Sequence, residues 1–552
     1  MHVTLNGYQW RVASEALWER LQPILERFPE VGDLAGARVL KSNRRRQVFH
    51  VPDSIGGQSG VIAKVYCYHD ALERWRYRLW RSRAEQEWHA LARFQALGLP
   101  TATALAVAEQ RDGLTPCGGG LIIEFLAGTR SLGDVLYDGS PTTESDTPAA
   151  ARGVSESQRA WLQMAARWIR RLHDGGAWHR DLHAGNLLAD EEKDRLYFID
   201  LHSCRFLPRL VRWQREEGLA TLLFSLSVSV PPEGLKIFLE AYGVDALRSS
   251  NLEELGQQFC RKIEKLRRKH WRSRSERCFL RSTEFDVTRE RGARIYRRRA
   301  VELPALMPLW TRKPSGEVLK SSARGWLVGT TVEERPVCVK YRRYNWLESL
   351  QNIFESHRLR RAYGAGHALT VRGLATPRVV ALREGRWFGL VREAHLVTEA
   401  LADAVPLDRF LRSRYGSEVA MIASEKHAVA RGIGALVRSI HDFDLYPHDL
   451  SPQNILVVDR PGTGTIAGRW QLHLVDLDHL YLWQPLWMRG RCKNLVQVGN
   501  LPEGHISTVD LLRGLHAYAR GEARFWSHDW MSRLRLQLLD EHLRVILRRR
   551  RG

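Results

Sequence analysis

The sequence predicts an α+β protein built from two tandem copies of one two-lobed domain, each with a small β-rich N-terminal lobe and a larger helical C-terminal lobe. The chain has 552 residues, too many for one hydrophobic core. Similar segments recur in the same order at an offset of roughly 270 residues. In each copy, β-rich runs come first and helical patterns follow. We therefore expect one domain at 1–255, a basic helical linker at 256–275 and a second domain at 276–552.

Charge is the strongest signal in the composition. The chain carries 84 Lys and Arg against 62 Asp and Glu, a net charge of +22. A surface with this excess favours an anionic partner, such as nucleic acid, an anionic membrane face or a phosphorylated glycolipid. The hydrophobic content of 44% is that of a folded protein and excludes a disordered chain.

The cysteines and the apolar runs indicate where in the cell the protein is expected. The seven cysteines are scattered and form no CxxC pair, which is typical of reduced thiols and not of a disulfide frame or a zinc site. The N-terminus lacks the pattern of a signal peptide. The longest charge-free run, 218–232, is short for a membrane span. If the protein meets a membrane, we expect it to lie on the surface.

The internal repeat covers most of the chain. The matching pairs are VLKSN and VLKSS, VIAKVY and VCVKYR, ARFQALGLPTA and GHALTVRGLATP, LIIEFLAG and LVTEALAD, WHRDLHAGNLL and YPHDLSPQNILV, and FIDLH and LVDLDH. Six matches in one order are hard to obtain by chance, so the chain is interpreted as two copies of one fold.

In the first copy, the organising motif is WHRDLHAGN at 178–186, followed by LYFID, which ends at Asp200. The spacing resembles the catalytic loop and metal-binding strand of protein kinases. The resemblance implies that Asp181 is the base and that Asn186 and Asp200 bind Mg²⁺. Each match alone has a plainer explanation, since HxD is frequent and an Asp after a strand often only forms a turn.

Lys64 lies inside the apolar run GVIAKVY, where burial is costly unless the ammonium group is paired. The kinase pattern implies contact with nucleotide phosphates and a glutamate partner on the next helix. Glu87 is the expected partner and Glu85 the reserve. The alternative is a lysine on the solvent face of an edge strand. Glu124, at the end of GGGLIIEFLAG, is expected where adenine bonds to the backbone.

The second copy repeats these positions with differences. Its counterparts are Lys340, Glu399, Asp449, Asn454 and Asp476. Ala362 stands where Glu87 is expected, so the partner of Lys340 is open, and Glu355 can serve only if the helix shifts. Neither copy has a clear GxGxxG before its lysine.

The chain resembles a tandem member of the lipopolysaccharide kinase family, which includes inner-core heptose and Kdo kinases with a protein-kinase-like fold. The motifs that carry the resemblance are DLHAGN with IDLHSCRF, HDLSPQN with VDLDHL, and the turns GLP and GLATP. The family implies ATP and Mg²⁺ as cofactors and a sugar hydroxyl of a lipid-linked core oligosaccharide as acceptor. It also implies a cytoplasmic location, peripheral on the anionic inner-membrane face.

Two alternatives remain at this point. One or both halves could be pseudokinases that bind glycolipid or partner enzymes, and the basic surface could bind nucleic acid, although no reading motif is present. The basic helix from Asn251 is read either as a solvated face or as a headgroup contact. We also expect flexible loops at 137–157 and 459–470.

Overall fold

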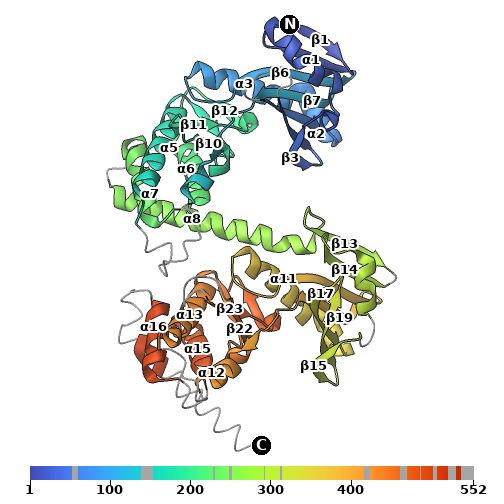
Figure 1. The fold of residues 1–552 in the computed structure, drawn as a ribbon, viewed down its shortest axis with the longest axis vertical. Helices are drawn as coiled ribbons and strands as arrows, with labels where there is room; N and C mark the ends of the chain where they lie inside the picture. The colour runs from blue at the N-terminus through green and yellow to red at the C-terminus, as the bar shows by residue number, and fades with distance from the viewer. Residues whose placement is uncertain are drawn as a thin grey trace, which may run out of the picture. The chain divides into compact units, whose positions relative to one another are not determined.

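The computed structural model divides by its contacts into two compact units, the first ending at Arg267 and the second beginning at Arg268. The described residues are 1–52, 60–137, 153–227, 230–247, 251–290, 292–310, 314–415, 423–460, 469–484, 486–501, 506–519 and 530–535. Most of the two loops expected at 137–157 and 459–470 falls outside these residues. Each unit has a β-rich lobe followed by a helical lobe (Figure 1).

The first β-rich lobe is a seven-stranded sheet in the order β1-β2-β6-β7-β5-β4-β3, with antiparallel neighbours. The strands are β1 (His2–Leu5), β2 (Tyr8–Val12), β3 (Arg38–Asn43), β4 (Arg46–Val51), β5 (Val61–Cys67), β6 (Ala104–Asp112) and β7 (Thr115–Glu124). Helix α1 (Trp18–Arg27) adds Leu21 and Leu25 to the core of this lobe. Helices α2 (Ala71–Leu79) and α3 (Arg83–Ala96) follow β5.

The run VLKSNRRRQVFHV, interpreted from the sequence as one β-rich run, forms the hairpin β3–β4. The side chain of Asn43 makes the turn, because its Oδ1 accepts hydrogen bonds from the backbone N–H groups of Arg45 and Arg46, both at 2.9 Å. Strand β5 lies between β4 and β7, so Lys64 is not on an edge strand. The edge-strand alternative for Lys64 is therefore wrong.

The first helical lobe contains α4 (Leu132–Leu136), α5 (Glu156–Asp174), α6 (Arg212–Leu226) and α7 (Pro232–Tyr242). Two small sheets carry the motif residues: one has β8 (Thr129–Ser131), β10 (Leu187–Asp190) and β11 (Arg195–Phe198), and the other has β9 (Ala177–His179) and β12 (Cys204–Phe206). Helix α5 begins with a capping box between Ser155 and Gln158. Its buried face, including Leu162, Ile169 and Leu172, belongs to the lobe's core.

The second unit repeats this arrangement with the sheet order β13-β14-β18-β19-β17-β16-β15. The strands are β13 (Phe285–Glu290), β14 (Ala293–Arg298), β15 (Glu317–Ser322), β16 (Gly325–Val332), β17 (Arg335–Arg343), β18 (Val379–Trp387) and β19 (Leu390–Glu399). The helices are α9 (Leu303–Leu306), α10 (Trp346–Phe354), α11 (Arg358–Val371), α12 (Leu407–Tyr415), α13 (Ala423–Asp442), α15 (Met488–Gly499) and α16 (Thr508–Ala519). The small strands of the second helical lobe are β20 (Val405–Pro406), β21 (Leu445–Pro447), β22 (Ile455–Asp459), β23 (Trp470–Leu474) and β24 (Leu480–Leu482). The same strand order in both units confirms the predicted tandem fold.

Helix α8 (Leu252–Ser275) contains the boundary between the two units. Its apolar stripe of Leu255, Phe259 and Ile263 joins the first helical core. Basic side chains along it form ion pairs, such as Lys262 Nζ with Glu216 Oε2 at 2.5 Å, and Arg268 Nε with Asp444 Oδ2 at 2.9 Å. The residue boundaries given from the sequence stay a proposal. All seven cysteines are free, and no described helix is long and apolar enough to cross a membrane.

Candidate active site

Lys64 is held by a buried glutamate. Its Nζ lies 2.6 Å from Glu87 Oε1, and the Lys64 side chain is only 7% exposed. Tyr66, two residues along the same strand, donates its hydroxyl to Glu87 Oε2 at 2.6 Å. Glu85 instead pairs with Arg11 at 2.9 Å. Both oxygens of Glu87 are therefore used to fix Lys64 and Tyr66 on the face of the sheet toward α3.

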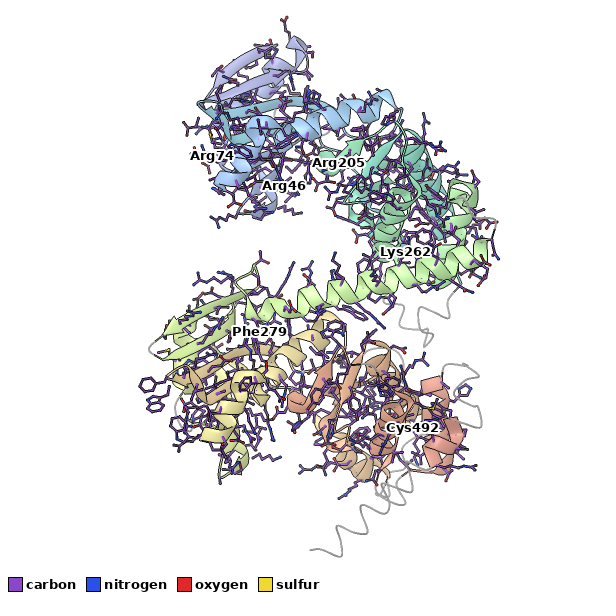
Figure 2. All side chains as sticks on the ribbon, turned by 180° about the vertical axis from the view of Figure 1, so that it is seen from behind. Arg46, Arg74, Arg205, Lys262, Phe279 and Cys492 are labelled. Carbon is purple, nitrogen blue, oxygen red and sulfur yellow. The ribbon has the colours of Figure 1, made fainter. Side chains whose placement is uncertain are left out.

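Asp200 lies two residues after β11, with its carboxylate between cations. Arg46, the first residue of β4, donates to Asp200 through Nη1 at 2.6 Å and Nη2 at 3.1 Å. His202 Nδ1 lies at 2.8 Å and Lys64 Nζ at 4.0 Å from Asp200 Oδ1. Figure 2 shows Arg46 on the β-rich lobe of this unit. The bidentate contact joins the β3–β4 hairpin to the strand-end aspartate across the two lobes.

These contacts set the charge of Asp200. Burial by itself raises the pKa of Asp200, but the hydrogen bond from His202 and the charges of Lys64 and Arg46 outweigh it and hold the pKa well below its usual value. The backbone of Asp200 is left-handed, with φ 60°, and so is that of Asp476 in the second unit, with φ 55°. Non-glycine residues adopt this conformation infrequently, and strained positions cluster at functional sites.

The loop before β10 carries Asp181 and Asn186. Asn186 is buried, and its Nδ2 donates to the backbone carbonyl of Asp181 at 2.9 Å. The backbone N–H of Asp181 donates to His179 Nδ1 at 3.2 Å, and burial lowers the pKa of His179 to about 4, so this imidazole is neutral. The Asp181 carboxylate itself is exposed, with its Oδ2 3.9 Å from His183 Nε2. The loop is thus fixed by its backbone, and its carboxylate faces solvent.

The donor set fits Mg²⁺ in kind. Asn186 uses its Nδ2 in the loop, which leaves the amide oxygen as the atom for a cation, and Asp200 offers two carboxylate oxygens. Hard oxygen ligands of this type suit Mg²⁺. The guanidinium of Arg46 already stands against both oxygens of Asp200, which shows that the position accepts positive charge. A metal ion held by Asp200 would have to compete with Arg46.

Glu124 ends strand β7 and is bonded to Thr103. Its Oε2 accepts from Thr103 Oγ1 at 2.7 Å, and its backbone N–H donates to Thr103 O at 2.9 Å. Glu399, the counterpart, donates its N–H to Arg378 O at 2.9 Å. Each residue ends the strand of its sheet that comes last along the chain, β7 or β19. Because the N–H of each is already bonded, neither backbone amide is available to adenine in this state.

In the second unit, Lys340 contacts aspartates and not a helix glutamate. Its Nζ lies 2.7 Å from Asp476 Oδ1 and 2.9 Å from Asp478 Oδ2. Burial lowers the pKa of Lys340, but the charges of Asp478 and Asp476 outweigh it and raise the pKa above its usual value. Asp478 occupies the position of His202 in the first unit, two residues after the strand-end aspartate.

The position that matches Glu87 carries no charged side chain. Ala362 is buried on α11. Glu355, the reserve partner considered for Lys340, is exposed and lies 4.0 Å from Arg361. Asp478 therefore supplies the second carboxylate that the sequence comparison did not find.

The second loop has the same frame as the first, with looser contacts. Asn454 Nδ2 lies 3.3 Å from Asp449 O and 3.4 Å from Asp449 Oδ2. Asp476 is 47% exposed, against 16% for Asp200. The first residue of β16 is Gly325, where the first unit has Arg46. A Cβ at Gly325 would clash with the carbonyl oxygen of Tyr341, so this backbone excludes a side chain.

Sequence reasoning missed Arg46, Tyr66, His202 and Asp478. The run SNRRR lacks the glycines of a phosphate-binding loop, but three arginines in the strand hairpin before the predicted strand lysine are themselves a signal of anion or carboxylate binding. The second aspartate of VDLDH was likewise readable as a spare carboxylate.

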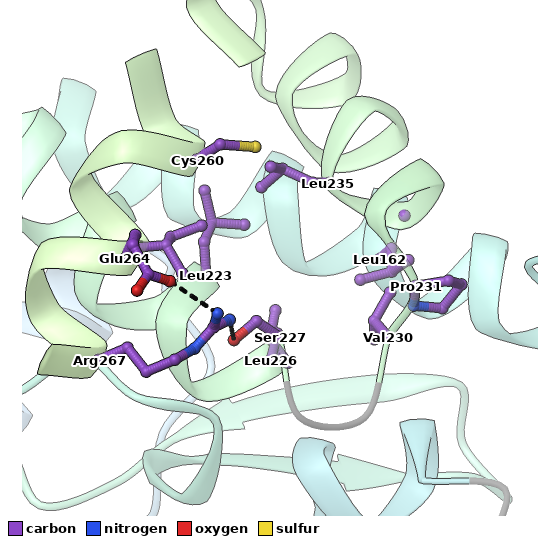
Figure 3. Close-up of a pocket in the computed structure, with 12 residues that line it drawn as sticks. Leu162, Leu223, Leu226, Ser227, Val230, Pro231, Leu235, Cys260, Glu264 and Arg267 are labelled. Atoms are coloured by element: carbon purple, nitrogen blue, oxygen red, sulfur yellow. Dashed lines mark hydrogen bonds and ion pairs between the residues drawn. The ribbon is translucent and has the colours of Figure 1, made fainter. Parts of the chain in front are cut away.

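A cavity of about 280 Å³ lies in the first helical lobe, away from these residues (Figure 3). Its wall is mainly apolar, with Leu162, Leu223, Leu226 and Ile263, and Glu264 and Arg267 form an ion pair of 2.9 Å at its side. None of the predicted site residues lines it.

Each unit has a lysine on a strand of its β-rich lobe, and its helical lobe carries a loop with an aspartate and an asparagine and a strand-end aspartate. Two such units define a tandem protein-kinase-like protein. The model of the lipopolysaccharide kinase (Kdo/WaaP) family matches residues 39–242 and 315–506. Because these segments cover more than half of the chain, the protein belongs to that family. The match in both halves confirms the tandem resemblance.

Curated relatives point the same way. The chain is 29% identical over 180 residues to the lipopolysaccharide core heptose(I) kinase WaaP of Pseudomonas aeruginosa, and 26% identical over 183 residues to that of Escherichia coli K12. Each match covers 31% of this chain and 64% of the relative. A solved structure of WaaP in complex with acyl carrier protein is 23% identical, with a TM-score of 0.33, covering 47% of this chain and 97% of that one.

Proposed function

We propose that the protein is an ATP- and Mg²⁺-dependent kinase that phosphorylates sugar hydroxyls of the lipopolysaccharide inner core, with a kinase-like site in each half. The observation that carries the proposal is the buried Lys64–Glu87 pair beside Asp200, together with the exposed Asp181 carboxylate on the loop that Asn186 holds. Fixed charges of this kind are what phosphoryl transfer needs, because catalysis there is mainly positioning and charge stabilisation.

The residues of the first unit take the following roles. Lys64, fixed by Glu87, binds nucleotide phosphates, and Asn186 and Asp200 hold Mg²⁺, which when bound offsets charge on the β- and γ-phosphates. The carboxylate of Asp181 accepts the proton of the acceptor hydroxyl. A bond forms between that oxygen and the γ-phosphorus while the bond to the ADP oxygen breaks.

The second unit has the corresponding set of Lys340, Asp449, Asn454 and Asp476. Support for a working site comes from Asp478, whose carboxylate lies 2.9 Å from Lys340 and takes the place of the missing glutamate. The alternative is that this unit is a pseudokinase that holds glycolipid or a partner enzyme. The greater exposure of Asp476 and the absence of an Arg46 counterpart favour that alternative.

For partners and location, we propose a lipid-linked core oligosaccharide as acceptor and peripheral attachment at the cytoplasmic, anionic face of the inner membrane. The support is the net charge of +22 together with the family to which the chain belongs. Nucleic acid is not expected as a partner.

The test supplies the purified chain with ATP, Mg²⁺ and core oligosaccharide from which phosphates have been removed, and follows phosphate transfer. Asp200→Asn keeps the side-chain size and removes the charge that binds metal, so we expect transfer by the first unit to fall by at least ~10²-fold. The matched control is Asp245→Asn, an exposed aspartate paired with Arg170 in the same unit. If the wild type transfers no phosphate to any core sugar but binds the glycolipid, the kinase proposal is wrong.

A further inference from the structure

Two exposed apolar patches occupy the same place in the two β-rich lobes. In the second unit, the patch consists of one face of α10 and the adjacent β18–β19 turn; we name it the α10 patch. Its members are Leu347, Leu350, Ile353, Phe354, Trp387 and Phe388. Phe354 is 90% exposed and Phe388 is 86% exposed, values that are costly for phenylalanine in water unless something covers the ring.

The two parts of the α10 patch are held together. The ring of Trp346, the first residue of α10, packs edge-on against Trp387 with centroids 5.1 Å apart. Ser349 Oγ, on the opposite face of the helix, donates to Val391 O at 2.9 Å and is buried. The helix is therefore fixed to β19 by its polar face, and its apolar face is turned outward. This orientation reverses the usual one for a helix on a globular domain.

The first unit has an equivalent exposed apolar patch made of different residues; we name it the α2 patch. It consists of Leu72, Trp75, Leu79 and Trp80, on and just after α2, and Leu114 in the β6–β7 turn. Arg74 Nη2 lies 3.2 Å from Asp112 Oδ2, which joins the helix to the turn, and Figure 2 labels this arginine. The two helices, ALERWRYRL and WLESLQNIF, have almost no residues in common. The exposed apolar side chains are therefore present in both units although the helix sequences differ.

Basic groups flank the patches. Arg78 and Arg81 beside the α2 patch, and Arg343 beside the α10 patch, are exposed and form no ion pair with any described residue. Arg392 stacks on Trp346 with its guanidinium carbon 4.1 Å from the ring centroid. Tryptophan, phenylalanine and leucine next to unpaired arginines form the pattern of a helix that lies in the interface of an anionic membrane.

We propose that the α2 patch and the α10 patch are membrane-docking surfaces that insert their apolar side chains among the lipids of an anionic bilayer. A second copy of the chain fits less well, because a symmetric contact sets each patch against itself and brings like-charged arginines together. The inference does not depend on catalysis. It rests on the proposed membrane attachment and deepens it by naming the residues that touch lipid.

The experiment is co-sedimentation of the full chain with vesicles of phosphatidylcholine alone and of phosphatidylcholine mixed with phosphatidylglycerol. The test variant carries Leu72→Ser, Leu79→Ser, Phe354→Ser and Phe388→Ser, all at exposed positions. The matched control is Leu280→Ser, which removes an apolar side chain that is also exposed but lies in neither patch. Thermal unfolding without vesicles verifies that each variant is folded.

We expect the wild type to prefer the anionic vesicles, the fourfold variant to bind them about tenfold more weakly or worse, and Leu280→Ser to bind like the wild type. Arg78→Ala with Arg81→Ala is expected to weaken binding to anionic vesicles and to reduce its salt dependence. Asp181→Ala should bind as the wild type does, which separates docking from catalysis.

Equal vesicle binding by the fourfold variant and the wild type contradicts the proposal, and so does a wild type that binds neither kind of vesicle. A third result also overturns it. If light scattering shows a dimer of the wild type that the fourfold variant dissociates, the patches are an interface between copies.

Discussion

Lys64 and Lys340 are ammonium groups at equivalent places that rely on different carboxylates. Lys64 takes Glu87 from α3, whereas Lys340 takes Asp478 from the segment after β23. Both lysines also stand near the strand-end aspartate, at 4.0 Å in the first unit and 2.7 Å in the second. In the second unit, the charges of Asp478 and Asp476 raise the pKa of Lys340, so that unit retains a positive group for phosphate.

Asp478→Asn should destabilise the second unit. The side chain is only 11% exposed, and the amide cannot replace the charge beside Lys340, so we expect a loss of about 1–2 kcal/mol. Calorimetry of thermal unfolding measures the change. Glu355→Gln is the control, since this glutamate is exposed, pairs only loosely with Arg361 at 4.0 Å and should change stability by less than about 0.5 kcal/mol. Equal losses in both variants would show that Asp478 is not the partner.

Arg46→Ala tests whether the guanidinium stands where a cation binds. Removing it leaves Asp200 with Lys64 and His202, and we expect the protein without magnesium to lose about 1–3 kcal/mol. Added Mg²⁺ should then raise the unfolding temperature more in Arg46→Ala than in the wild type, because it no longer competes with the guanidinium. An equal magnesium effect in the two proteins contradicts the competition. Arg45→Ala, next in the chain and exposed, is the control.

Buried histidines predict a loss of stability in acid. Burial lowers the pKa of His173 and of His441 to about 3, and each Nδ1 lies 2.9 Å from a tyrosine hydroxyl. Their folded pKa lies below the unfolded value of about 6.5, so the unfolded chain binds the proton first and stability falls as pH drops below about 6.5. We expect a loss of roughly 1–2 kcal/mol per histidine between about pH 7 and pH 5. Denaturant unfolding across that range should show a shallower fall for His441→Gln; an unchanged slope contradicts the assignment.

For individual residues, the sequence indicated the candidate site residues more clearly than it indicated their contact partners. Lys64 was recognisable because a lysine inside an apolar strand needs a partner, and Glu87 was the nearer of two candidates on the next helix. Arg46 and Asp478 were not recognised, since their contacts depend on how a hairpin and a strand end meet in three dimensions. The roles of the candidate site residues in binding nucleotide and metal stay predictions.

Among the elements, α10 best shows what a pattern can and cannot predict. The spacing of Leu350, Ile353 and Phe354 is that of an apolar helix face, and such a face is ordinarily expected in the core. The structure turns it to solvent, because Ser349 on the other side bonds to β19. The apolar spacing is visible in the sequence, but it does not indicate what covers the face.

Asn345→Ala should loosen α10. Asn345 and Glu348 form a capping box, with Asn345 Oδ1 accepting from Glu348 N at 2.7 Å and Glu348 Oε2 accepting from Asn345 N at 3.0 Å. Loss of the cap should cost about 1 kcal/mol and speed hydrogen exchange in the first turn of α10. Gln351→Ala, an exposed position inside the same helix, is the control and should leave exchange unchanged. Equal exchange in Asn345→Ala and the wild type would falsify the cap's role.

For the molecule as a whole, the repeat was the most informative feature of the sequence. Six matched segments predicted two copies of one fold, and the family match in both halves and the identical strand orders confirm it. The repeat showed that Glu87 has no counterpart at Ala362, but it did not show that Asp478 takes its place or that Gly325 stands where Arg46 binds Asp200. Those exchanges leave Asp200 16% exposed among cations and Asp476 47% exposed, so the first site is the more preorganised.

The most direct test of the central claim is phosphate transfer from ATP to dephosphorylated core oligosaccharide by Asp181→Asn, by Asp449→Asn and by the double variant. Each change keeps the shape of an exposed loop side chain and removes the proposed base, worth at least ~10²-fold in rate. We predict that Asp181→Asn abolishes the greater part of the transfer, that Asp449→Asn removes the smaller remainder, and that all three proteins unfold at the same temperature. Wild-type rates in the double variant would contradict a kinase that uses these two aspartates.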